Sequence, residues 1–254
     1  IVEKKDNPKQ IAEAVNEGLN VLQEVSPEKI PETISKVIDT VANQTPTKLT
    51  EVAKEIIKEF SNSTNSSEQV AAVAKEVVSA TLQKFSPELK LEQTPKLIES
   101  AINAVKPEQQ ASVAKEIGKA AITELTNIST SSTEMTSKIN QSIAQTINSA
   151  SKNSPENTAV LTNMALNNVK QDQQLPLAKH IISTLIENNN ISQANNAIKE
   201  SVQILTQPLK EPAQIAKVIN EVIQTTSQSA KETAQLPSLT NQAVLAAIKD
   251  RPAV

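Results

Sequence analysis

The chain contains only two glycines, Gly18 and Gly118, and both lie within amphipathic patterns rather than at turns. Two-residue β-hairpin turns and phosphate-binding loops depend on glycine, because glycine adopts positive φ angles without steric cost. A chain without glycine at its turns is a poor candidate for a β-sheet protein or for a nucleotide-binding fold. With so few glycines, helices are the main way in which the backbone N–H and C=O groups can form hydrogen bonds.

Proline marks where those helices begin. It is tolerated in the first turn of a helix and is disruptive in the interior, and a preceding Ser or Thr makes a good N-cap. We interpret each Ser/Thr-Pro pair as a helix start: Ser26-Pro27, Thr45-Pro46, Ser86-Pro87, Thr94-Pro95 and Ser154-Pro155. Further starts are expected at Pro8, Pro107, Pro176, Pro212 and Pro237.

Between the prolines, apolar residues recur at every third or fourth position. Leu49, Val52, Ile56 and Phe60 are one such series. This spacing is that of an amphipathic helix, and about twelve segments of roughly 14–20 residues show it. No comparable stretch alternates with period two, so the sequence predicts an all-α fold without strands.

The segments also resemble one another. Val-Ala-Lys-Glu-Ile/Val occurs at 52–56, 73–77 and 113–117, and Ser-Pro-Glu begins at residues 26, 86 and 154, with Gln207-Pro208 in the place of a fourth copy. Two arrangements fit these repeats. One is an α-solenoid-like array of short helices, and the other is a stack of three-helix units of roughly sixty residues. Amphipathicity alone is an alternative explanation of the shorter period.

We therefore predict one helical-repeat domain over residues 1–254, with possible soft joints at 61–67 and 127–132. The sequence begins Ile-Val-Glu-Lys-Lys-Asp, without Met or an apolar signal segment. We interpret the chain as a piece of a longer protein.

The composition limits what the core can be. There is no Trp, Tyr or Cys, and Phe60 and Phe85 are the only aromatic residues. Large rings normally supply much of a globular core. This core must instead bury many Ala, Val, Ile and Leu side chains, which suits a thin layer repeated many times. The lack of Cys also excludes disulfides.

The charges are balanced, with 25 basic and 28 acidic residues and a net charge of −3. No run of like charge is present. Nucleic-acid grooves need a basic stripe, and spanning helices need about 18 consecutive apolar residues. We therefore predict no nucleic-acid partner and no membrane insertion.

Catalytic chemistry has few candidates. His180 is the only histidine, and no Gly-x-Ser-x-Gly elbow or cysteine accompanies it. We interpret His180 as a helix-surface residue without a special role. The series Glu51, Glu55 and Glu59 lies among lysines, which indicates charge pairing on a helix face rather than acid–base work. The sequence predicts no catalytic residues, no metal site, no cofactor and no enzymatic activity.

A candidate partner-binding helix lies in the most apolar segment, around residues 70–78. Amphipathic helices can be donated to a partner's groove. The alternative, which we favour, is that this helix is a central core helix. The candidate residues are Val70, Val73, Ala74, Val77 and Leu82.

The chain is rich in Ala, Val, Ile, Lys and Asn, poor in aromatic residues and interrupted by Ser-Pro and Asn-Ser pairs, and the segment from Lys106 to Ile117, KPEQQASVAKEI, is one of its helical repeats. In this composition the chain resembles the helical regions of rickettsial surface-cell-antigen proteins. That resemblance implies a bacterial surface protein acting on host cells. Family members promote actin assembly, act as adhesins or, in one case, bind vinculin. Val73-Ala74 and Val77 match the centre of the vinculin-ligand pattern, while residues 69–70 and 80–81 depart from it.

Taken together, the sequence predicts a non-catalytic protein-binding or scaffold module of a bacterial protein, with a host cytoskeletal protein of the actin-assembly or vinculin type as the partner class. The alternative is a structural spacer or stalk without a partner of its own. A surface or secreted location is favoured over a cytoplasmic one. The oligomeric state and the curvature of the array are left open.

Overall fold

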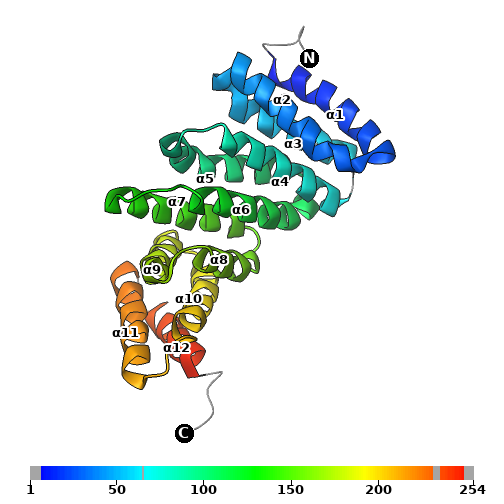
Figure 1. Ribbon diagram of the computed structural model, residues 1–254. Helices are drawn as coiled ribbons and strands as arrows, with labels where there is room; N and C mark the ends of the chain where they lie inside the picture. Colours follow the sequence, from blue (N-terminus) through cyan, green and yellow to red (C-terminus); the bar gives the residue numbers. More distant parts are fainter. Residues whose placement is uncertain (1–6, 65, 231–234, 249–254) are drawn as a thin grey trace. The chain divides into compact units, whose positions relative to one another are not determined.

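The computed structural model describes residues 7–64, 66–230 and 235–248. In these ranges the chain forms twelve α-helices and no strand, so the predicted all-α fold is confirmed (Figure 1). The helices are α1 (Pro8–Val25), α2 (Ile30–Gln44), α3 (Leu49–Ser63), α4 (Ser67–Gln83), α5 (Pro87–Ala104), α6 (Gln110–Thr126), α7 (Thr133–Ser151), α8 (Asn157–Asn167), α9 (Gln171–Glu187), α10 (Ile191–Thr206), α11 (Pro212–Ser229) and α12 (Leu236–Ile248).

The chain folds into two compact units, residues 1–124 and residues 125–254. The single domain over 1–254 stays a prediction. The predicted joint at 127–132 is the loop between α6 and α7, beside this division. The predicted joint at 61–67 begins inside α3. Residue 65 of this joint lies outside the described residues. Residues 1–6, from which we interpret the chain as a piece of a longer protein, also lie outside them.

Within each unit, helices pack mainly against the helix two positions along the chain. In the first unit α3 lies between α1 and α5, and α2 packs on α4. In the second unit α9 lies between α7 and α11, and α10 lies between α8 and α12. Each unit therefore has an odd layer and an even layer, and its repeat is one helical hairpin (Figure 1).

A hydrogen bond between two neighbouring helices of the odd layer agrees with a repeat of this kind. Lys179 Nζ of α9 donates to Glu221 Oε2 of α11 at 2.8 Å, and the two residues are 42 positions apart. That separation falls within the roughly 40–47 residues typical of stacked two-helix repeats. Of the two predicted arrangements, the helix packing thus shows the two-helix array rather than three-helix units.

The repeated Val-Ala-Lys-Glu motif is a packing motif. Val52, Ala53 and Ile56 of α3 are buried at 1% exposure or less, while Lys54 and Glu55 between them are partly exposed. Positions one, two and five of such a motif share one helix face, because the helix turns once in about 3.6 residues. The copies in α4 and α6 bury the same three positions. The predicted thin aliphatic core is therefore present.

Most of the predicted helix starts are correct, but two are wrong. Pro95 lies inside α5, and Pro176 lies inside α9. An interior proline removes one hydrogen bond to the carbonyl four residues earlier. The Thr94 hydroxyl does not cap a new helix. It donates to the Lys90 carbonyl at 2.6 Å, within the same helix.

The turns confirm the argument from glycine. Among the described residues no glycine has a positive φ, and Asn189, at φ 59°, is the one non-glycine residue that does. Asn is the residue type other than glycine that enters this region most readily.

Candidate functional site

The structure places the predicted partner-binding residues of α4 in the core of the first unit. The exposed fractions of Val70, Val73, Ala74, Val77 and Leu82 are all 3% or less. The helix packs against α2, α3 and α5. These values agree with the alternative interpretation of this segment, in which α4 is a core helix. A partner could contact these side chains only if α4 left the unit, and binding by α4 stays an untested prediction.

An open groove of about 450 Å³ lies between α9 and α11 in the second unit. Volumes of this size are ordinary for ligand-binding clefts. The two helices are neighbours in the odd layer, as Figure 1 shows. The groove is lined by Leu175, Pro176, Lys179, His180 and Ser183 from α9, and by Thr225, Gln228 and Ser229 from α11.

The helical period explains why these residues share the groove. Pro176, His180 and Ser183 are spaced by four and three positions along α9 and so lie on one face. Thr225 and Gln228 are spaced by three along α11. The neighbouring face of α9, with Leu177 and Ile181, is fully buried. Burial of the apolar face therefore turns the polar face towards the groove.

The lysine that lines the groove, Lys179, forms an ion pair with Glu221. Lys179 Nζ of α9 lies 2.8 Å from Glu221 Oε2 of α11. The hydrogen bond and the charge of Lys179 lower the pKa of Glu221, and the charge of Lys217 adds to this effect. The pair is partly exposed and links the two helices. The groove consequently carries little net charge.

Two side chains on opposite walls are free to receive a ligand. The Ser183 hydroxyl donates to the His180 carbonyl at 3.1 Å, and the Thr225 hydroxyl donates to the Glu221 carbonyl at 2.9 Å. The imidazole of His180 and the amide of Gln228, in contrast, have no hydrogen-bond partner among the residues that the structure describes. An amide offers both a donor and an acceptor.

The imidazole of His180 is expected to titrate below its ordinary range. Burial of the ring disfavours the charged form and lowers its pKa from 6.5. Because the chain has one histidine, the imidazole proton resonances in an NMR pH titration report this group alone. We expect a midpoint below 6.5, with a return towards that value in urea. Because the unfolded chain binds the proton more readily, the free energy of unfolding of the second unit should fall as the pH drops below 6.5. It should level off once His180 is protonated in the folded state as well. A folded midpoint at or above 6.5 would contradict the burial of this ring.

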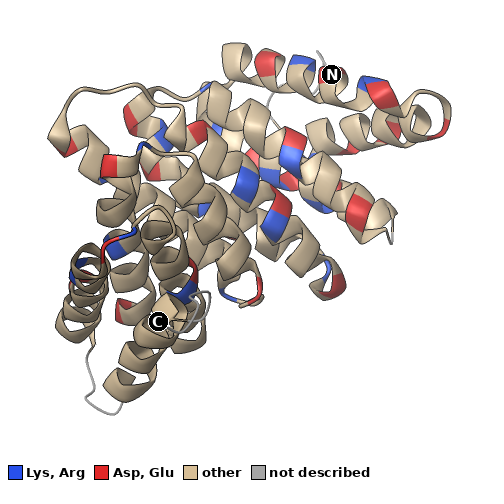
Figure 2. Ribbon diagram, turned by 60° about the horizontal axis from the view of Figure 1, so that its bottom comes forward, with Lys and Arg blue, Asp and Glu red and all other residues tan. Residues whose placement is uncertain are grey.

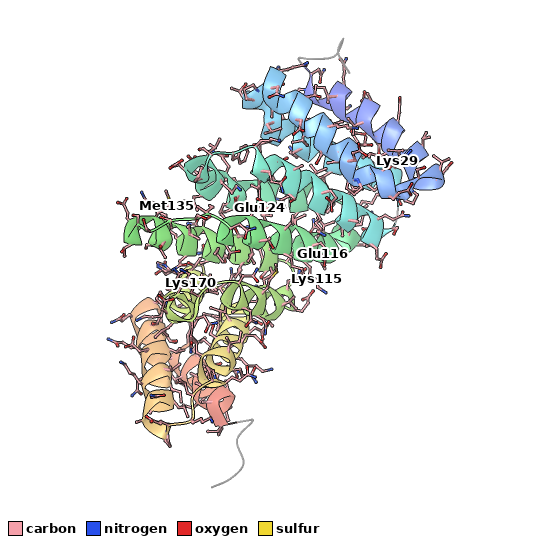
Figure 3. The ribbon with its side chains drawn as sticks, in the orientation of Figure 1. Lys29, Lys115, Glu116, Glu124, Met135 and Lys170 are labelled. Carbon is pink, nitrogen blue, oxygen red and sulfur yellow. The ribbon has the colours of Figure 1, made fainter. Side chains whose placement is uncertain are left out.

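A charged cluster around Glu124 belongs to the first unit and is structural. Glu124 of α6, labelled in Figure 3, lies 3.0 Å from Lys90 Nζ of α5 through its Oε2 atom. Its Oε1 atom accepts hydrogen bonds from Gln83 Nε2 at 2.9 Å and from Ser79 Oγ at 3.4 Å, both on α4. The side chains of Glu124 and Lys90 are each only 13% exposed. This cluster joins three helices and leaves neither charge without a partner.

Elsewhere the charged residues are distributed without a dominant sign. Figure 2 shows Lys and Arg interspersed with Asp and Glu along the helices. Among the described residues no three His, Cys, Asp or Glu side chains are grouped closely enough to hold a metal ion. None of the helices in the described ranges has the length and apolar character needed to cross a bilayer.

Comparisons with known proteins add little. No family model matches the chain, and no curated protein sequence matches it. One similar solved structure is described as "Computational Design of Self-Assembling Cyclic Protein Homooligomers". It is 15% identical, covers 93% of this chain and 97% of its own, and has a TM-score of 0.25. At that TM-score the likeness says nothing further about this chain, and the rickettsial resemblance stays a prediction.

Proposed function

We propose that this chain is a non-catalytic protein-binding module, and that the groove between α9 and α11 binds an extended segment of a partner protein. The observation that carries the proposal is the pair of free polar side chains, His180 and Gln228, on opposite walls of an open groove. Stacked helical hairpins commonly use such inter-helix surfaces for binding.

The chemistry of the lining favours an uncharged peptide. The Gln228 amide can both donate to a backbone carbonyl and accept from a backbone N–H. The neutral imidazole of His180 supplies a further donor or acceptor. Leu175 and Pro176 offer apolar contact, and Glu221 already compensates Lys179. The resemblance to surface antigens makes a host cytoskeletal protein the first partner class to test.

The test is a selection of displayed short random peptides on the wild-type chain, with counter-selection on Gln228→Ala. Enriched peptides are then measured by fluorescence anisotropy. We expect Gln228→Ala to weaken their binding about tenfold, because a hydrogen bond lost in a partly desolvated groove costs about 1–1.5 kcal/mol.

A matched control lies one turn away on the same helix. Gln224 is exposed on α11 and does not line the groove, so Gln224→Ala should leave peptide binding unchanged. If no peptide is enriched, or if both substitutions weaken binding equally, the groove is not a peptide site. The spacer interpretation would then be the better account of the second unit.

A further inference from the structure

A second cavity, of about 340 Å³, lies within the second unit and is more enclosed than the groove between α9 and α11. Its walls come from the end of α6 and the loop after it, the N-terminal part of α7, the loop between α8 and α9, and the first turn of α9. No residue lines both this cavity and the groove. A cavity of this volume can hold a small organic molecule.

Asn140 is a polar residue at a core position of α7. It lies one and two turns before Ala144 and Ile147, which are fully buried on the same side of the helix. Asn140 is itself only 3% exposed and lines the cavity, and its side-chain amide has no hydrogen-bond partner among the residues that the structure describes. A buried amide without a partner lowers stability, and such groups are normally satisfied by protein, water or a ligand. Asn140 therefore indicates that the cavity receives a molecule that forms hydrogen bonds.

The same cavity is lined by a lysine without an ion pair. Lys170, labelled in Figure 3, is the one charged residue among the described residues that line the cavity, and no described carboxylate pairs with it. It directly precedes α9, whose N-terminus has no side-chain cap. The N-terminus of a helix favours negative charge. Asp172, in the first turn of α9, is exposed and does not line the cavity.

We propose that this cavity binds a small organic acid through its carboxylate, at a site separate from the peptide groove. Lys170 and the N-terminus of α9 attract the carboxylate, and the amide of Asn140 donates a hydrogen bond to the ligand. The apolar part of the ligand contacts the aliphatic residues of the lining, Ile128, Ile139 and Val169. A single carboxylate suits the site better than a phosphate, because a second negative charge would meet no second cation among the described residues that line the cavity.

The test compares hexanoate with its neutral amide, hexanamide, on the wild-type chain at neutral pH. NMR follows the side-chain amide resonances of Asn140, which are assigned by their absence from the spectrum of Asn140→Ala. We expect hexanoate to shift these resonances with a Kd of about 1 mM or tighter. Hexanamide should bind about tenfold more weakly, because it lacks the charge that Lys170 attracts.

Two variants test the two groups, and binding to them is followed at the backbone amide of Ser129, which also lines the cavity. Lys170→Gln should weaken hexanoate binding about tenfold and leave hexanamide binding unchanged. Asn140→Ala should weaken the binding of hexanoate about tenfold, yet melt at or above the temperature of the wild type, since it removes an unpaired amide. Lys210→Gln is the matched control, at an exposed lysine of the same unit that does not line the cavity. It should bind hexanoate like the wild type.

Three results would each overturn the proposal. Asn140 resonances that hexanoate leaves unshifted would mean that the cavity holds water only. Equal binding of hexanoate and hexanamide, or equal weakening by Lys170→Gln and Lys210→Gln, would exclude recognition of a carboxylate. An Asn140→Ala variant that melts below the wild type, or that binds hexanoate as tightly, would make the amide a structural group rather than a ligand-binding one.

Discussion

Val77→Asp is expected to unfold the first unit. Val77 is fully buried on α4, a helix that packs on α2, α3 and α5. A carboxylate at this position would lose its hydration in an aliphatic environment. We expect a destabilisation of about 4 kcal/mol or more, which is a large part of the roughly 5–15 kcal/mol that stabilises a typical domain. Thermal melting followed by circular dichroism, with limited proteolysis to locate the melted segment, measures this change.

Lys75→Ala is the matched control on the same helix. The Lys75 side chain is 49% exposed, and its ammonium lies 3.9 Å from Glu76. Exposed ion pairs contribute little, so this substitution should change the free energy of unfolding by about 0.5 kcal/mol or less. If Val77→Asp melted like Lys75→Ala, the assignment of α4 to the core would be wrong.

The helices and the core could be predicted because both depend on local spacing. Val52, Ala53 and Ile56 are buried as the amphipathic period requires. A Ser-Pro pair such as Ser86-Pro87 does begin a helix, with Leu89 N donating to the Ser86 hydroxyl. Thr94-Pro95 has the same local chemistry but lies mid-helix, since the N-terminal cap of α5 is already supplied by Ser86.

The repeat length was harder to obtain from the sequence. Ser-Pro-Glu precedes α2, α5 and α8, which belong to both layers, so it marks helix starts and not repeats. The better signal was the series Ile34, Val73 and Val113 on alternate helices, spaced by 39 and 40 residues. Apolar positions of that kind are constrained by packing on the next repeat, whereas caps are constrained only by their own helix.

The groove and the Glu124 cluster could not be predicted, because each depends on side chains brought together from separate helices. Lys90 and Glu124 are 34 residues apart. Gln228 differs in no local feature from the exposed Gln224. His180 was interpreted as a surface residue without a role, and only the neighbouring α11 shows that it lines a groove.

The polar core of the second unit was also not foreseen. Several hydroxyls there are buried with no hydrogen-bond partner in the described part of the chain: those of Thr146, Ser151, Thr158, Thr162 and Ser201. Ser and Thr in helices are usually exposed or act as caps, so sequence patterns place them on the surface. Unpaired hydroxyls lower the stability of a core. The buried hydroxyls without partners that the structure records all lie in this second unit.

Glu124→Ala is expected to have the second largest effect on stability. Removing one partner of a largely buried ion pair leaves the other charge uncompensated, and measured costs of this kind begin at about 3 kcal/mol. Here the substitution strands the ammonium of Lys90 and removes the acceptor of Gln83 and Ser79. We expect a loss of about 3 kcal/mol in the free energy of unfolding, measured by urea denaturation.

Two further variants distinguish the cost of leaving the Lys90 charge buried without a partner from the cost of losing the Glu124 side chain itself. Glu116 pairs with Lys119 on the same helix but is more exposed, so Glu116→Ala should cost only about 0.5 kcal/mol. The double variant Lys90→Met/Glu124→Leu removes both charges and keeps apolar volume, and it should recover most of the stability that Glu124→Ala loses. Gln83 is exposed and can hydrogen-bond to water instead. If the double variant were as unstable as Glu124→Ala, the hydrogen bonds from α4, and not the stranded charge, would be what stabilises this junction of three helices.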